Sequence, residues 1–138
     1  MNKKILAIYG SPRKKGNTDL LMDNLIKGIQ DNTSFNDAII DKVFVRDLDI
    51  SSCKECSSCS KDGICILKDE MQDVFERLIS CDFLAVSSPI FFTTVSGTLK
   101  PLIDRCQRFW ALKYELKKDI INKSRKGIFI STAGHDSD

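Results

Sequence analysis

The stretch KILAIYGSPRKKGNT, residues 4–18, decides the fold. Its first part, residues 4–9, is a nearly continuous apolar run, which is typical of a strand buried on both faces of a parallel sheet. A polar loop follows, and beyond it apolar residues recur at helical spacing, namely Leu20, Leu21, Met22, Leu25, Ile26 and Ile29. We therefore predict a strand over residues 4–9 and a helix over residues 18–31, with Asn17 or Thr18 as its N-cap.

Similar patterns predict the rest of an α/β domain. Strands are expected over residues 38–45, 83–88 and 127–132, and helices over residues 69–80 and 98–111. The strand at 83–88 is predicted to end at Pro89, and the charges in the strand at 38–45 suit a sheet edge. Because strands and helices alternate, we expect a doubly wound parallel sheet with helices on both faces. Such a sheet usually has a fifth strand and a last covering helix. Neither is evident here, so we expect either a fragment or an edge completed by another subunit.

Length and composition favour a single domain over residues 1–138, of which 42% are hydrophobic. The 21 basic and 19 acidic residues are mixed along the chain, which argues against a nucleic-acid partner. The first apolar run is too short for a signal peptide or a membrane span, so we expect a cytoplasmic protein without membrane contact. In a reducing cytoplasm, clustered cysteines favour a metal site or a redox motif over structural disulfides.

The loop after the first strand has the features of a phosphate site. It joins a strand to a helix N-terminus, where free backbone N–H groups and the helix dipole attract an anion. It contains neither a Walker loop nor a G-x-G-x-x-G motif. An ordinary polar turn with a capped helix is the alternative. The residues predicted to bind the anion are Ser11, Arg13, Lys15, Gly16, Asn17 and Thr18.

Two more loops are expected at the same edge of the sheet, where open α/β folds bind ligands. The loop after residue 88 combines flat apolar surface with hydroxyl groups, which suits a planar, partly polar ring. As the alternative, Phe91 and Phe92 are core or dimer contacts. The residues predicted to contact the ligand from these two loops are Ser88, Pro89, Ile90, Phe91, Phe92, Thr132 and Gly134.

The motifs GSPRKKGNT, SPIFFTTVSGTLKPLIDR and ISTAG, in this order, resemble the NAD(P)H-dependent FMN reductases. The resemblance implies a flavodoxin-like fold with strand order 2-1-3-4 over nearly all of the chain. It also implies FMN at the carboxyl end of the sheet, with the phosphate in the loop 11–18 and the ring against residues 88–92. Tyrosine is common in the family near Phe91. Phenylalanine keeps the ring packing but loses a phenol hydrogen bond.

The segment 51–68 contains four cysteines whose function the features described so far do not explain. Cys53, Cys56, Cys59 and Cys65 form the motif C-x2-C-x2-C-x5-C. Thiolates are soft donors that bind iron well, and four of them are the number that a 4Fe-4S cluster needs. The spacing resembles the iron-sulfur flavoproteins of the same family, which hold such a cluster in the loop after the second strand. A tetrahedral zinc site, free thiols and disulfides are the alternatives.

Together these features predict an FMN-dependent oxidoreductase with a 4Fe-4S cluster. It would pass electrons from a ferredoxin-like donor, or from NAD(P)H, to a small-molecule acceptor, without a catalytic acid, base or nucleophile. The alternatives are an NAD(P)H-dependent FMN or quinone reductase without a cluster, and a zinc-stabilised binding module. The resemblance also suggests a homodimer or homotetramer. We expect Asp104 and Arg105 to make surface or interface contacts, and His135 to be exposed to solvent.

Overall fold

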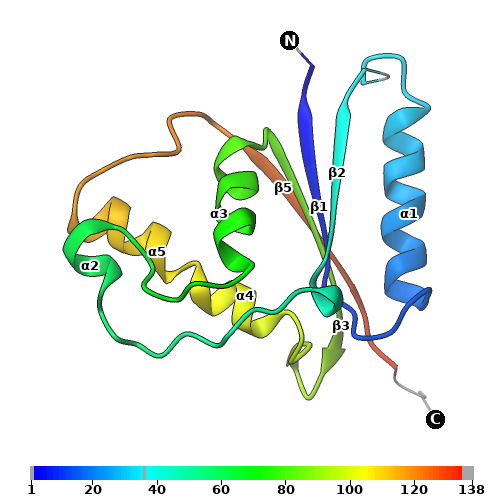
Figure 1. Ribbon diagram of the computed structural model, residues 1–138. Helices are drawn as coiled ribbons and strands as arrows, with labels where there is room; N and C mark the ends of the chain where they lie inside the picture. The colour runs from blue at the N-terminus through cyan, green and yellow to red at the C-terminus, as the bar shows by residue number, and fades with distance from the viewer. Residues whose placement is uncertain (1, 36, 135–138) are drawn as a thin grey trace.

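The computed structural model describes residues 2–35 and 37–134 and shows a parallel sheet with helices on both faces (Figure 1). The parallel strands lie in the order β2 (Ile39–Phe44), β1 (Lys4–Tyr9), β3 (Phe83–Phe91) and β5 (Lys126–Thr132). This confirms the predicted order 2-1-3-4, because β5 is the fourth strand that the sequence indicated. The prediction that the charged second strand stands at an edge is also confirmed.

The helices divide between the two faces of the sheet, as Figure 1 shows. On one face lies α1 (Asn17–Gln30), and on the other lie α3 (Met71–Ser80), α4 (Lys100–Arg105) and α5 (Gln107–Trp110). The remaining helical pieces are α2 (Cys59–Asp62), a 3-10 turn at Val45–Asp47 and a π turn at Ala111–Glu115. No helix in the described ranges 2–35 and 37–134 is both long enough and apolar enough to cross a membrane.

Two apolar layers hold the helices to the sheet. Successive side chains of a strand point to opposite faces, so β1 contributes to both layers. Leu6 and Ile8 join the layer beneath α3 and α4, while Ala7 and Tyr9 pack with Met22 and its neighbours on α1. The period-2 and helical patterns of the sequence therefore correspond directly to the core.

Three features of these elements differ most from the sequence-based expectation. Strand β3 does not end at Pro89 but continues to Phe91, because its last residues pair with β5 and with a short antiparallel strand, β4 (Thr94–Val95). The helix expected over residues 98–111 is divided at Cys106, where tight i→i+3 hydrogen bonds replace the regular pattern. The expected side-chain N-cap of α1 is also wrong, since Gly16 occupies that position and no side chain caps the helix.

The segment 51–68, expected to be a loop, contains the single helical turn α2. That turn ends at Gly63, whose φ of +79° lies in the left-handed region that glycine adopts without strain. Further along the chain, α5 ends at Trp110, a half-exposed indole 5.8 Å from the ring of Tyr114. The preceding Phe109 instead packs edge-on against Phe75 in the core, with 5.6 Å between the ring centres.

Candidate functional site

A cavity of about 350 Å³ lies where β1, β3 and β5 end. Its walls come from all three loops that the sequence singled out, which confirms that these loops converge. The predicted residues that line it are Ser11, Arg13, Asn17, Thr18, Pro89, Ile90, Phe91, Thr132 and Gly134, and Pro12 and Ala133 complete it. The cavity combines hydroxyl groups and a cation on one side with apolar surface on the other.

Four of the predicted ligand residues do not line this cavity. Ser88 is fully buried, and its hydroxyl accepts a hydrogen bond from the N–H of Ser96 at 2.9 Å, which is a structural role. Phe92 is fully exposed in the turn between β3 and β4. Gly16 and Lys15 lie in the backbone just before α1, with Lys15 at a φ of 55°.

The start of α1 suits a phosphate group. Because no side chain caps this helix, the N–H groups of its first turn are available to an anion. The hydroxyl groups of Thr18 and Thr132 lie 2.8 Å apart and join this end of the helix to the end of β5. The donors and the uncapped helix therefore fit the phosphate of FMN, and the apolar wall from Pro89 to Phe91 fits its ring.

The loop is held against the sheet by close contacts at its first residue. The N–H of Gly10 donates to the carbonyl of Ser87 at 2.8 Å, and the Ser96 hydroxyl donates to the Gly10 carbonyl. A Cβ at position 10 would lie 2.5 Å from the Ser87 oxygen, so only glycine fits. The N–H of Leu99 donates to the Ser96 hydroxyl at 3.1 Å, which ties the loop to the start of α4.

A second cavity, of about 560 Å³, is lined by all four cysteines of the predicted cluster motif. Cys53 and Cys56 are exposed, while Cys59 and Cys65 are half-buried. Burial raises the pKa of the Cys59 thiol, and the nearby thiols of Cys65, Cys53 and Cys56 raise it further. Within the described ranges, no three metal-binding side chains converge closely enough to hold a single ion. The four thiols instead lie around the wall of the cavity.

The backbone between these cysteines is strained. Glu55 and Ser57 have φ values of 53° and 59°, in the left-handed region that costs a side-chain-bearing residue about 1–2 kcal/mol. Strain of this kind persists where a site requires it, and it clusters at ligand-binding segments. The donor set, the cavity and this backbone are therefore consistent with a metal cluster.

Arg105 is a residue that sequence reasoning assigned wrongly. It is not a surface residue but is 2% exposed, and its guanidinium donates to both Asp69 carboxylate oxygens, at 2.7 and 3.0 Å. It also donates to the carbonyl of Ser51 at 2.9 Å. The sequence does contain a sign of its burial, because Arg105 shares a helix face with Leu102 and Phe109 and so interrupts an apolar stripe. Asp104, by contrast, pairs on the surface with Lys100, as expected.

The contacts of Arg105 place a buried cation beside the cysteines. Burial alone would lower the pKa of the guanidinium, but the adjacent Asp69 and Cys65 raise it above its ordinary value. Burial alone would likewise raise the pKa of the Asp69 carboxyl, yet hydrogen bonds from Arg105 and backbone N–H groups outweigh burial and lower it. A second arginine of the cavity, Arg108, donates to the Gly63 carbonyl at 2.7 Å.

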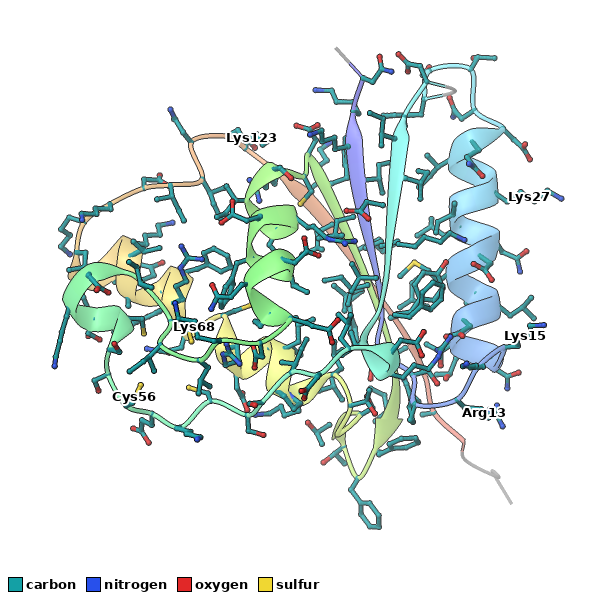
Figure 2. All side chains as sticks on the ribbon, viewed as in Figure 1. Arg13, Lys15, Lys27, Cys56, Lys68 and Lys123 are labelled. Atoms are coloured by element: carbon teal, nitrogen blue, oxygen red, sulfur yellow. The ribbon has the colours of Figure 1, made fainter. Side chains whose placement is uncertain are left out.

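The two cavities are separate. Among the described residues, they have no lining residue in common. Figure 2 shows Arg13 and Lys15 beside α1 on one side of the sheet and Cys56 beside α2 on the other. The cysteine segment leaves the end of β2 and then runs along the face covered by α3, α4 and α5 (Figure 1). His135 lies outside the described residues.

Comparison with known proteins agrees with this geometry. The profile of the NADPH-dependent FMN reductase family matches residues 3–137. The chain belongs to this family. Its fold is also that of solved flavoproteins: RosB, solved with bound 8-demethyl-8-formylriboflavin-5'-phosphate, superimposes with a TM-score of 0.71 at 15% identity, over 97% of this chain and 53% of that one. The predicted flavodoxin-like fold is confirmed.

Several curated relatives of this chain are named iron-sulfur flavoproteins. One from Archaeoglobus fulgidus is 30% identical, over 74% of this chain and 44% of its own length. Another, from Methanocaldococcus jannaschii, is 31% identical over 95% of this chain and 62% of its own length. The predicted resemblance to this branch of the family is confirmed. The chain spans about half the length of the curated relatives it matches.

Proposed function

We propose that the protein is an FMN-dependent oxidoreductase that carries a 4Fe-4S cluster and forms a single FMN-binding domain over residues 1–138. The observation that carries this proposal is the pair of cavities, one lined by three flavin-type loops and one by four cysteines. The family match and the names of the relatives support both cofactors. The electron donor is a ferredoxin-like protein or NAD(P)H, and the acceptor is a small molecule.

The residues of the first cavity would bind and orient FMN. Ser11, Asn17 and Thr18, with the first turn of α1, would donate hydrogen bonds to the phosphate, and Arg13 would balance its charge. Pro89, Ile90 and Phe91 would pack against the ring and exclude water from one face.

In the second cavity, Cys53, Cys56, Cys59 and Cys65 would ligate the cluster as thiolates. Bound together, the two groups allow single electrons to enter and one or two to leave. The chain's own part is to hold the thiolates, and Arg105 places a positive charge on the wall of their cavity. No side chain acts as an acid, a base or a nucleophile.

Anaerobic purification followed by spectroscopy and metal analysis tests this assignment. We expect flavin bands with a broad shoulder at about 400 nm, and about four iron and four sulfide per chain after reconstitution. Flavin bands without iron would indicate a reductase without a cluster, and bound zinc without flavin would indicate a binding module. Iron that stays absent after anaerobic reconstitution would refute the cluster.

A cysteine exchange provides the matched comparison. Cys56→Ser removes a proposed ligand and should lower the iron content well below that of the wild type. Cys106→Ser is the control, because this thiol lies outside the cavity and donates to the Leu102 carbonyl within its own helix. Equal iron content in the two variants would contradict the ligand assignment.

We further propose that the protein works as a homodimer or homotetramer. Since the two cavities of one chain share no lining residue among those described, assembly would allow the cysteines of one subunit to approach the flavin of another. Sedimentation equilibrium of the loaded protein should then give a multiple of the 15.6 kDa chain mass. A loaded monomer would contradict this proposal.

A further inference from the structure

An acidic side chain lies in the first turn of α1, beside the proposed phosphate site. Asp19 is 4% exposed, and its Oδ2 accepts a hydrogen bond from the N–H of Lys15 at 3.1 Å. Its other oxygen, Oδ1, is buried without a hydrogen-bond partner among the described residues. A carboxylate in this place repels an approaching phosphate and competes with it for the positive end of the helix. A phosphate-binding loop therefore requires a counter-charge.

Arg46, from the 3-10 turn after β2, supplies that counter-charge. Its Nη1 lies 3.0 Å from Oδ2 of Asp19, and both side chains are almost completely buried. The same nitrogen donates to the carbonyls of Ser11 and Arg13, at 3.2 and 3.4 Å. One buried cation thus neutralises the carboxylate and holds two carbonyls of the loop on its own side.

Arg46 acts from behind the loop and not from within the flavin cavity. It lines a different cavity, of about 410 Å³, which it shares with Leu48, Ile50 and Thr98. Pro12 lines both this cavity and the flavin cavity, so the loop is the wall between them. Because the carbonyls of Ser11 and Arg13 are bonded on the Arg46 side, they do not direct negative charge towards the ligand.

We propose that Arg46 is the positioning residue that allows the loop 11–18 to bind a phosphomonoester. Arg46 neutralises the charge of Asp19. It also holds the loop so that the carbonyls of Ser11 and Arg13 point away from the ligand. This inference rests on the proposed binding of FMN. It is specific for the phosphate half of the flavin, because the ring half of the cavity is built from β3 and β5.

Comparing FMN with riboflavin, which lacks the phosphate, tests the role directly. We expect Arg46→Gln to weaken FMN binding by roughly 10- to 100-fold, as an uncompensated carboxylate near the phosphate would, and to change riboflavin binding less than about 3-fold. In Asp19→Asn/Arg46→Gln, FMN binding should recover most of this loss, and the remaining loss would reflect the missing hydrogen bonds to the carbonyls of Ser11 and Arg13. Both dissociation constants are measured by equilibrium dialysis of the full chain after removal of bound flavin.

Two further variants keep the result interpretable. Asp19→Asn alone should bind FMN at least as tightly as wild type, and it remains informative if Arg46→Gln does not fold. Arg77→Gln is the control, because Arg77 pairs with Asp41 and Asp73 near the other end of the sheet and should leave both constants unchanged.

The outcomes separate the possibilities. The inference would be overturned if Arg46→Gln weakened FMN and riboflavin binding equally. It would also be overturned if Asp19→Asn weakened FMN binding as much as Arg46→Gln does. Either result would show that the ion pair serves only to stabilise the fold. Unchanged FMN binding in Arg46→Gln would overturn the inference as well, while the proposed function stands. Wild-type protein that binds neither flavin would overturn the proposed function and the inference with it.

Discussion

Gly63 shows how a single residue fixes the cysteine segment. It ends α2 in the left-handed conformation, and a Cβ there would lie 2.3 Å from Cδ2 of Leu112. We expect Gly63→Ala to lower the free energy of unfolding by about 3 kcal/mol, from backbone strain and overpacking together. Urea denaturation measures the change. Gly28→Ala, in α1 with open space around it, should instead stabilise the protein by about 0.5–1 kcal/mol.

The Asp69 carboxyl makes stability depend on pH. Since its pKa in the folded protein lies below the unfolded value of about 3.9, its contribution is present above that pH and is lost as the pH falls through the folded pKa. We expect Asp69→Asn to cost roughly 3 kcal/mol at pH 7, because it leaves the Arg105 charge without a carboxylate. The difference between variant and wild type should shrink as the pH falls below about 4. Urea denaturation of the apoproteins over this range would show a constant difference if the idea were wrong.

At the scale of the element, the cysteine segment 51–68 is a long connection between β2 and α3, and the side chain of Arg105 holds both of its ends. Arg105 donates to the Ser51 carbonyl at the start of the segment, and to Asp69 just beyond its end. We expect Arg105→Gln to free the segment, so that trypsin cleaves after Lys54 and Lys61 at least about 10-fold faster in the apoprotein. Iron uptake on reconstitution should fall as well.

The surface pair on the same helix is the control for this prediction. Lys100 and Asp104 are both substantially exposed, so Lys100→Gln should change stability by less than about 1 kcal/mol and leave the two cleavage rates unchanged. Cleavage in Arg105→Gln as slow as in wild type would show that other contacts hold the segment.

At the scale of the whole molecule, the two binding regions are separate. Their cavities share no lining residue within the part of the chain that the structure describes, so we expect the two cofactors to load independently. Cys56→Ser should bind FMN within about 2-fold of the wild-type dissociation constant, and Arg46→Gln should take up wild-type amounts of iron. Equilibrium dialysis and iron analysis of the same preparations measure both. Parallel losses of both cofactors would show coupling between the two regions.

Local patterns predicted most of this architecture, because buried strands and amphipathic helices leave periodic signals in the sequence. The convergence of the three flavin-type loops followed from the rule that parallel strands end at one edge. The buried pairs of Asp69 with Arg105 and of Asp19 with Arg46 could not be predicted in this way. The partners of each pair are distant in sequence, so no local pattern joins them, although the place of Arg105 in an apolar stripe does mark that residue as buried. The separation of the cavities depends on the path of the cysteine segment, which has no periodicity.

Trp110 gives the molecule an optical reporter of its own. It is the single tryptophan of the chain, and it ends the helix that also contributes Gln107 and Arg108 to the wall of the cysteine cavity. An iron-sulfur cluster absorbs light broadly, including at the wavelengths that an indole emits. Tryptophan emission should therefore fall as the cysteines take up iron and recover when a chelator removes it, which follows the loading of one cavity in real time without any label.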